Sequence, residues 1–255
     1  GPATTPRRVA LVHDWLTGMR GGERALEAIC ELFPDATRFA LLHVPGSVSG
    51  TIEARPIRTS FIQWLPRSHR HYRLLLPLFP MAVEQFDLDD FDLIISTRHC
   101  AAKSVVPPGR TPHLCYCFTP MRYAWDQFDA YFGPDRVGAG VTRMFRWGLI
   151  TMARWDVATA GRVNRYVAIS QYVAGRIRRY YNRDASVVYP PVDTALFQPS
   201  GKPPGAYLLI VSALVPYKRV DLAIRACALA GVPLRIVGSG PELARLRDAA
   251  GPSVE

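Results

Sequence analysis

The sequence predicts an α/β protein whose helices cover parallel sheets. Short apolar segments alternate with amphipathic segments along the 255 residues, and this alternation favours parallel strands joined by helices. Hydrophobic residues make up 49% of the chain and charged residues 20%, which excludes a disordered protein because such a chain is too polar to bury a core. The length allows one or two domains.

The first strand–helix–strand unit begins close to the start of the chain. Residues 9–13 have the composition of a buried strand, and a polar turn rich in glycine follows them. Apolar residues recur at helical spacing from Leu26 onward, which predicts an amphipathic helix over residues 22–33 that ends before Pro34. A second strand is expected over residues 37–43.

The alternation continues beyond this first unit. Ser170 is a good N-cap for a helix that follows a strand. The pattern predicts further strands over residues 92–96, 113–117, 166–169 and 186–189, and a helix over residues 140–160.

A proline-rich segment divides the chain. Residues 190–205 hold five prolines and little periodicity, which is typical of an interdomain linker. We expect a complete Rossmann-like domain over residues 1–189 and a second unit over residues 206–255, with strands at 206–212 and 233–237. Because the second unit is only half of such a domain, we expect a truncated chain, self-association, or a missing C-terminal segment that covers it.

The chain is strongly basic. Thirty-one lysines and arginines against 21 acidic residues give a net charge of +10. Two stretches without acidic residues, between Glu53 and Glu84 and between Asp156 and Asp184, carry eleven arginines: Arg55, Arg58, Arg67, Arg70, Arg73, Arg162, Arg165, Arg176, Arg178, Arg179 and Arg183. Such stretches attract nucleic acid, anionic lipid or phosphorylated ligands. An arginine-rich proteome would give the same charge, so both interpretations stay open.

Five cysteines do not fit a disulfide-rich scaffold, which would be smaller and denser in cysteine. Cys115 and Cys117 would point to one face of a buried strand, and no second pair completes a zinc site. We therefore predict buried, reduced thiols in a cytoplasmic protein.

Two strand–helix turns have features of a phosphate site. Gly21 and Gly22 would let a ligand approach the N–H groups of a helix N-terminus, although turn geometry alone also explains them. Lys218 and Arg219 at another helix start would hold an anion such as a diphosphate, despite opposing the helix dipole there. The alternative is that Lys218 and Arg219 belong to a solvated helix end. If they hold an anion, residues 238–241 at the next strand–helix turn would line the same binding cleft.

Two acidic patterns are interpreted as ordinary surface. Asp87 and Asp89 form a D-x-D pattern, but they precede a strand, so we expect a solvated turn. Glu23 and Glu31 form an E-x7-E pattern, and with Glu27 they share one helical face that we expect to face solvent.

Residues 61–79 mix aromatic, leucine and arginine residues. Two interpretations stay open. The segment is either an interfacial segment that touches an anionic membrane surface, which would suit a lipid-linked acceptor, or a core helix with an arginine-rich face.

Five segments together resemble a known enzyme family. They are VHDWLTGMRGGERALEAICELFP, CYCFTPMRYAWD, VAISQYVAGRIRRYY, VVYPPVD and LVPYKRVDLAI, in this order. The chain is similar to family 4 (group 1) retaining glycosyltransferases of the GT-B fold, and most similar within them to bacterial mannosyltransferases that use GDP-mannose. The resemblance covers nearly the whole chain.

The resemblance implies two Rossmann-like domains. The second would hold most of the nucleotide-sugar donor, the first most of the acceptor, and no metal or other cofactor is implied. By position, Gly21 and Gly22 match the family's glycine loop beside the donor diphosphate. Lys218 matches a lysine that contacts the diphosphate, and Arg219 lies beside it.

The same resemblance places Phe118, Arg122, Tyr123 and Asp126 in the acceptor and sugar cleft. Phe118 stands where the family usually has a histidine, and Ala213 stands where it usually has an arginine. The family's own E-x7-E segment, which binds the donor, would lie beyond residue 255, so we expect this chain to be inactive alone.

The predicted function is transfer of a sugar, mannose by the resemblance, from a nucleotide-diphosphate donor to a hydroxyl of a glycan or glycolipid acceptor, with retention. The expected location is the cytoplasm or the inner face of the membrane. The alternative is a non-enzymatic module that binds nucleic acid or anionic lipid. Since the sequence has no nucleic-acid-binding motif, we expect no nucleic-acid partner.

Overall fold

A computed structural model describes residues 8–121, 139–199, 201 and 203–255. The chain forms two compact units, Gly1–Val192 and Asp193–Glu255. The division between them falls within the proline-rich segment 190–205.

Within the described residues, the first unit is built on a sheet of seven parallel strands. Their order is β3-β2-β1-β4-β5-β6-β7. The strands are β1 (Val9–His13), β2 (Thr37–Ala40), β3 (Ile57–Thr59), β4 (Leu93–Arg98), β5 (His113–Cys117), β6 (Arg165–Ala168) and β7 (Ala185–Val187). The strands are added outward from β1 on both sides: β2 and β3 on one side, and β4 to β7 on the other.

The central strand β1 shows how both faces of this sheet are buried. All five of its residues are buried. Ala10 and Val12 belong to one core cluster, whereas Val9 and Leu11 belong to another. Successive side chains of a strand point to opposite faces, so the two clusters lie on the two sides of the sheet, as expected for parallel strands.

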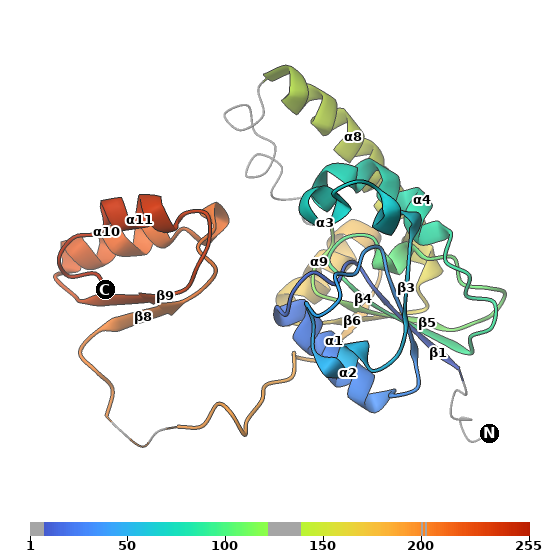
Figure 1. The fold of residues 1–255 in the computed structure, drawn as a ribbon, viewed down its shortest axis with the longest axis horizontal. Coiled ribbons are helices and arrows are strands. Elements are labelled where there is room, and N and C mark those ends of the chain that lie inside the picture. Colours follow the sequence, from blue (N-terminus) through green and yellow to red (C-terminus); the bar gives the residue numbers. More distant parts are fainter. Residues whose placement is uncertain (1–7, 122–138, 200, 202) are drawn as a thin grey trace. The chain divides into compact units, whose positions relative to one another are not determined.

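Helices cover both faces of the sheet (Figure 1). Residues of α1 and α2 pack in the cluster with Leu11, and residues of α4 and α8 pack in the cluster with Ala10. The α-helices of this unit are α1 (Gly21–Leu32), α2 (Gly50–Glu53), α3 (Ser68–His71), α4 (Phe79–Glu84), α8 (Ala139–Ala158) and α9 (Gln171–Tyr181). Its 3-10 helices are η1 (Phe61–Trp64), η2 (Tyr72–Leu78), η3 (Ala102–Ser104) and η4 (Thr159–Arg162). In the described part of the chain, no helix is both long enough and apolar enough to cross a bilayer.

Several local signals in the sequence are confirmed. The helix α1 matches the predicted amphipathic segment, and its own residues Leu26 and Cys30 are buried. Ser170 caps α9, because its Oγ accepts a hydrogen bond from the Val173 N–H at 3.2 Å. All five cysteines are free and buried. Asp87 and its neighbour Asp89 are exposed in a turn, as expected.

The segment 61–79 is not one continuous core helix, which corrects that interpretation. It is divided among η1, α3, η2 and the first residue of α4, with Pro77 inside η2. Its side chains alternate between core and surface: Ile62 and Tyr72 are buried, whereas Trp64 is 83% exposed.

The second unit is a smaller α/β arrangement. Its described strands, β8 (Leu208–Val211) and β9 (Leu234–Val237), are parallel neighbours. The other elements are η5 (Pro216–Lys218), α10 (Val220–Ala230) and α11 (Leu243–Ala249). A small core holds Leu214, Val220, Ile224, Cys227, Leu234 and Leu246. The predicted α/β fold with parallel strands is thus confirmed in both units.

Candidate functional site

The carboxyl ends of β1, β4 and β5 form the candidate site of the first unit. In open parallel sheets, ligands bind outside the carboxyl ends of the strands where the strand order reverses. Here that point lies between β1 and β4, which pair from Val9–Leu93 to His13–Thr97. Three loops meet at this edge: the glycine turn after β1, the loop before η3, and the segment after β5.

Asp14, the residue after β1, organises the loop that follows β4. Its carboxylate accepts backbone N–H bonds from four consecutive residues, at 2.6–2.8 Å: His99, Cys100, Ala101 and Ala102. Burial opposes ionisation of Asp14, but the charges of His99 and His13 and the backbone donors together lower the pKa of this carboxyl. Asp14 is therefore an ionised, fully buried anchor for the β4–η3 loop.

His99 brings an imidazole to this edge of the sheet. Its Nδ1 lies 3.4 Å from the Asp14 Oδ2, and its ring packs edge-on against Trp15 with centroids 4.5 Å apart. The side chain is 22% exposed, whereas that of Asp14 is fully buried. A carboxylate behind a partly exposed imidazole orients the ring, and such a ring can exchange hydrogen bonds with a ligand hydroxyl.

Glu23 corrects a prediction, because it is buried and does not face solvent. It lies in the first turn of α1, where its Oε2 accepts the Arg20 backbone N–H at 3.0 Å. Its Oε1 lies 3.7 Å from the His13 Nε2, and His13 in turn contacts the Thr97 hydroxyl at 2.7 Å. Burial alone would raise the pKa of Glu23, but the interaction with His13 lowers it overall. The first turn of α1 thus already carries an internal anion.

The two glycines of the predicted phosphate turn differ in their surroundings. A Cβ on Gly22 would lie 3.1 Å from the ring of Phe118 and 3.7 Å from that of His13. A Cβ on Gly21 would meet nothing within 4 Å. Close packing under Phe118 therefore explains Gly22, whereas Gly21 is exposed and leaves open space at the helix start.

Phe118 follows β5 and joins this site. Its ring makes edge-on contacts with the ring of His13, at 6.5 Å between centroids, and with that of Tyr116, at 5.6 Å. The other three residues predicted for the acceptor cleft, Arg122, Tyr123 and Asp126, lie outside the described residues.

A buried ionic network lies behind the site and was not predicted. The Asp156 Oδ1 is 3.2 Å from the Arg98 Nη1 and 3.1 Å from the Lys103 Nζ. The Tyr181 hydroxyl donates to the Asp156 Oδ2 at 2.6 Å and accepts from Arg98 at 2.8 Å. Burial lowers the pKa of Lys103 to about 8, although Asp156 counteracts this effect. The network ties β4 and η3 to α8 and α9, and so fixes the loop that carries His99.

In the second unit, Lys218 and Arg219 lie between η5 and α10. Lys218 ends η5, and Arg219 takes a left-handed conformation before the first residue of α10. The Arg219 guanidinium donates to the Asp221 Oδ1 at 3.1 Å, and Asp221 also accepts from Arg225 at 3.2 Å. Asp221 supplies a favourable negative charge in the first turn of α10, which offsets part of the unfavourable interaction between these cations and the helix dipole.

The two strand–helix loops of the second unit touch each other. The Leu214 N–H donates to the Ser239 carbonyl at 2.8 Å, and the Glu242 N–H donates to the Leu214 carbonyl at 3.1 Å. A Cβ on Gly238 or Gly240 would overlap the carbonyl oxygen of Ser212 or Leu214, respectively. These glycines are thus explained by close approach of one backbone to another.

Sequence reasoning missed the residues that make the buried hydrogen bonds and ion pairs of the site: Asp14, His99, Arg98, Lys103 and Asp156. One signal pointed to some of them, because Asp14 and His99 directly follow buried strands. Polar residues at such positions meet at one edge of a parallel sheet. No local signal marks Asp156, which lies in the last turn of α8.

The chain matches the family model described as Glycosyltransferase Family 4 over residues 19–196. Among curated proteins, none matches. Solved structures with the same fold include the lipopolysaccharide outer core galactosyltransferase WaaB in its apo form, with a TM-score of 0.54 and 16% identity over 95% of this chain. Anabaena Alr3699/HepE in complex with UDP gives a TM-score of 0.59 and 18% identity over 94% of this chain.

These likenesses to solved structures show a shared fold. This chain spans 64% of the length of each of the two proteins. The predicted partial GT-B architecture, a complete Rossmann-like unit followed by part of another, agrees with that coverage.

Proposed function

This chain belongs to Glycosyltransferase Family 4, and from that membership we propose that it serves transfer of a sugar from a nucleotide-diphosphate donor to an acceptor hydroxyl, with retention. The observation that carries the proposal is the family match over residues 19–196, which includes the carboxyl ends of β2 to β7 in the first sheet. The ordered loops at that edge support it, because a transferase needs preformed contacts for two substrates.

We further propose that the donor is GDP-mannose. The support is that the five segments quoted above, taken together, most resemble mannosyltransferases that use GDP-mannose. A fold neighbour, Anabaena Alr3699/HepE, was solved with UDP and with UDP and glucose, so a uridine donor is the competing choice.

The chemistry requires charge stabilisation more than a nucleophile. As the bond between the sugar C1 and the diphosphate oxygen breaks, negative charge grows on that oxygen. The acceptor oxygen then bonds to C1, and its proton passes to the departing diphosphate. Preorganised cations and N–H groups lower the barrier for such a step.

We assign the diphosphate contacts to Gly21, Gly22, Lys218 and Arg219. Glu23 already occupies the first turn of α1 as an anion, so backbone N–H groups alone are a weak diphosphate site there. Cationic side chains hold a diphosphate more strongly, and Lys218 is a cation at a helix start in the second unit. We assign the acceptor side to Phe118, Arg122, Tyr123 and Asp126, and we add His99 because it follows β4 at the edge where Phe118 follows β5.

Calorimetry with GDP tests the donor assignment. Lys218→Ala is expected to weaken GDP binding roughly 10- to 100-fold, because a hydrogen bond to a charged group contributes about 1.5–3 kcal/mol. Arg245→Ala is the matched control, since Arg245 is an exposed cation of the same unit paired with Glu242. Equal GDP affinity of both variants and the parent would remove Lys218 from the donor site.

A thermal-shift series distinguishes donor classes. GDP-mannose is expected to raise the melting temperature more than UDP-glucose does, and a single-stranded oligonucleotide is expected to have no effect. A larger shift with UDP-glucose would overturn the mannose assignment. A shift with the oligonucleotide alone would instead favour a nucleic-acid-binding module.

A further inference from the structure

The helical run from Ser68 to Glu84 has one face fixed against the core. The elements α3, η2 and α4 follow one another without a gap. Tyr72, Leu76, Phe79 and Val83 recur at helical spacing and are buried in the main core cluster. Because this row is anchored, the opposite row of side chains is held outward.

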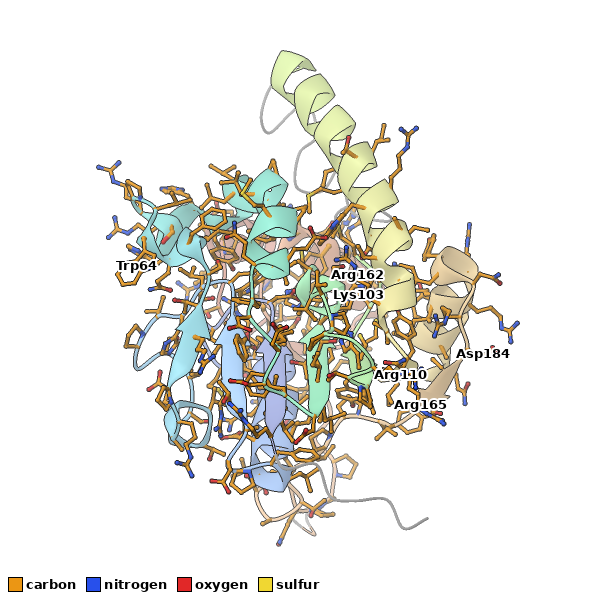
Figure 2. The ribbon with its side chains drawn as sticks, turned by 90° about the vertical axis from the view of Figure 1, so that its right-hand side faces the viewer. Trp64, Lys103, Arg110, Arg162, Arg165 and Asp184 are labelled. Carbon is orange, nitrogen blue, oxygen red and sulfur yellow. The ribbon has the colours of Figure 1, made fainter. Side chains whose placement is uncertain are left out.

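The outward row is apolar at several positions. Arg70, Leu74, Pro77 and Met81 follow the same three- and four-residue spacing and are all exposed. Leu74 is 56% exposed and Met81 is 55% exposed. Trp64 lies on η1, which packs beside α3, and is 83% exposed at the outer edge of the unit (Figure 2).

The charges around this row are positive. Arg67 and Arg70 are exposed, and neither has an ion-pair partner within the described residues. His69 and His71 are exposed on α3 between and beside them. There is no acidic residue between Glu53 and Glu84 in the sequence.

The two acidic residues that bound this stretch are both engaged elsewhere. Glu84 accepts hydrogen bonds from Arg162 at 2.7 Å and from Trp155 at 3.0 Å. Glu53 accepts bonds from His43 and from the Gly46 N–H, both at 2.8 Å. Neither carboxylate therefore neutralises the outward arginines.

We propose that Trp64, Arg67, Arg70, Leu74 and Met81 form a docking face for an anionic lipid bilayer. Arginines attract the charged surface, while tryptophan and aliphatic side chains enter the boundary between headgroups and acyl chains. A protein partner fits less well, because the exposed Arg67 and Arg70 belong to the same face and charged residues are depleted at the core of protein interfaces. This inference stands apart from the proposed sugar transfer, and its test requires no substrate.

A comparison within the same unit supports the choice of partner. Leu32 at the end of α1 is 75% exposed, but its neighbours include Glu31 and Asp35. An anionic surface would repel that site, so exposure alone does not define the docking face. The docking face is defined by exposed apolar residues together with arginines that have no ion-pair partner in the described part of the chain.

Flotation with lipid vesicles tests the proposal on the full 255-residue chain. We expect binding to vesicles of phosphatidylcholine and phosphatidylglycerol, and little binding to phosphatidylcholine alone. Binding should fall as salt concentration rises, because salt screens the arginines. Brominated lipids should quench part of the tryptophan fluorescence, and Trp64→Ser should remove that quenching.

Two double variants separate the contributions of charge and apolar surface. Arg67→Gln with Arg70→Gln should weaken binding to anionic vesicles roughly 20-fold, since each arginine near the surface contributes roughly fivefold. Leu74→Ser with Met81→Ser should weaken it roughly 10-fold by removing buried apolar area. All four side chains are exposed, so thermal unfolding should be unchanged.

Matched controls use exposed residues elsewhere on the unit. Arg110 and Arg165 are exposed and lie far from Trp64 in Figure 2. Arg110→Gln with Arg165→Gln removes the same charge as the first double variant, and Leu32→Ser removes an exposed apolar side chain. If these controls weaken binding as much as the docking-face variants, net charge is responsible and the proposal is wrong.

Two further results would overturn the proposal. One is the absence of binding to anionic vesicles at low salt. The other is a dimer in light scattering that Trp64→Ser dissociates, because a second copy of the chain would then occupy this face.

Discussion

The strands β1 and β8 have similar apolar sequences but very different surroundings. All five residues of β1 are buried, whereas Leu208, Leu209 and Val211 of β8 are 55%, 55% and 72% exposed. β1 has a strand on each side and core clusters on both faces, while β8 pairs with β9 in the described part of the second unit. An apolar run therefore predicts a strand, but its burial depends on how many neighbours the fold brings to it.

Carboxylates between a strand and the end of the next helix's first turn differ in the same way. In the first unit, Asp14 is fully buried and accepts four backbone hydrogen bonds. In the second unit, Asp221 is partly exposed and pairs with two arginines. The first carboxylate holds a loop together, and the second balances charge at a helix end.

Of the substitutions considered, replacing Asp14 should lower the free energy of unfolding the most. Asp14→Asn removes the buried charge and turns amide hydrogens toward backbone donors, so we expect a loss of about 3–5 kcal/mol in the free energy of unfolding. Urea denaturation measures this loss. Asp221→Asn is the matched control, and we expect no measurable change there because the pair is open to solvent. Equal effects of the two variants would contradict the comparison.

The buried cation Lys103 predicts a pH-dependent stability. Because burial lowers its pKa in the fold from 10.5 to about 8, the unfolded chain holds this proton more tightly. The resulting penalty is present below pH 8 and is relieved as the pH rises from 8 to 10.5.

Comparison with Lys103→Met isolates this effect from other titrating groups. Relative to that variant, the parent should gain stability on the order of 3 kcal/mol across the interval, as the pKa shift implies. Urea denaturation at a series of pH values provides the measurement. A constant difference between the two proteins would show that Lys103 keeps its ordinary pKa in the fold.

Glycine substitutions sharpen the comparison at the loops. Gly238→Ala would place a Cβ on the Ser212 carbonyl, a backbone atom that cannot turn away, so we expect a loss of about 1–3 kcal/mol in the second unit. Gly22→Ala would press only on the Phe118 ring, so we expect about 1 kcal/mol or less in the first.

Two variants complete this glycine series. Phe118→Leu should rescue Gly22→Ala, and Gly21→Ala should be neutral because its Cβ meets open space. Thermal unfolding followed by circular dichroism would rank all of them. A larger effect at Gly22 than at Gly238 would reverse the comparison.

Periodicity and local chemistry predict many of the helices and strands of this chain, but not β3 or the division of residues 61–79 among short helices. The helix α1, the Ser170 cap of α9, the solvated turn at Asp87 and the burial of the cysteines all follow from residues close together in sequence. These features depend on short-range hydrogen bonds and on which face of a strand or helix is apolar. The prediction of a parallel sheet followed from the same alternation of strands and helices.

The candidate site could be predicted only in part. Gly22 and Phe118 were singled out, and the structure brings them into contact at the sheet edge. Glu23 was assigned to solvent because its helical face carries other acids, yet its position in the first turn directs it toward His13. Helical periodicity predicts whether a whole face of a helix is polar or apolar. It does not predict which residue of the first turn contacts a neighbouring strand.

The ionic contacts of the site depend on residues that are far apart in the chain. Asp14 accepts a hydrogen bond from His99, which lies 85 residues further along the chain. Arg98 donates a hydrogen bond to Tyr181, which lies 83 residues further along. Parallel strands place such residues side by side, because each crossover returns the chain to the same edge of the sheet. A buried charge is stable only beside the partner that this return supplies, so its role became visible only once the strands were in register.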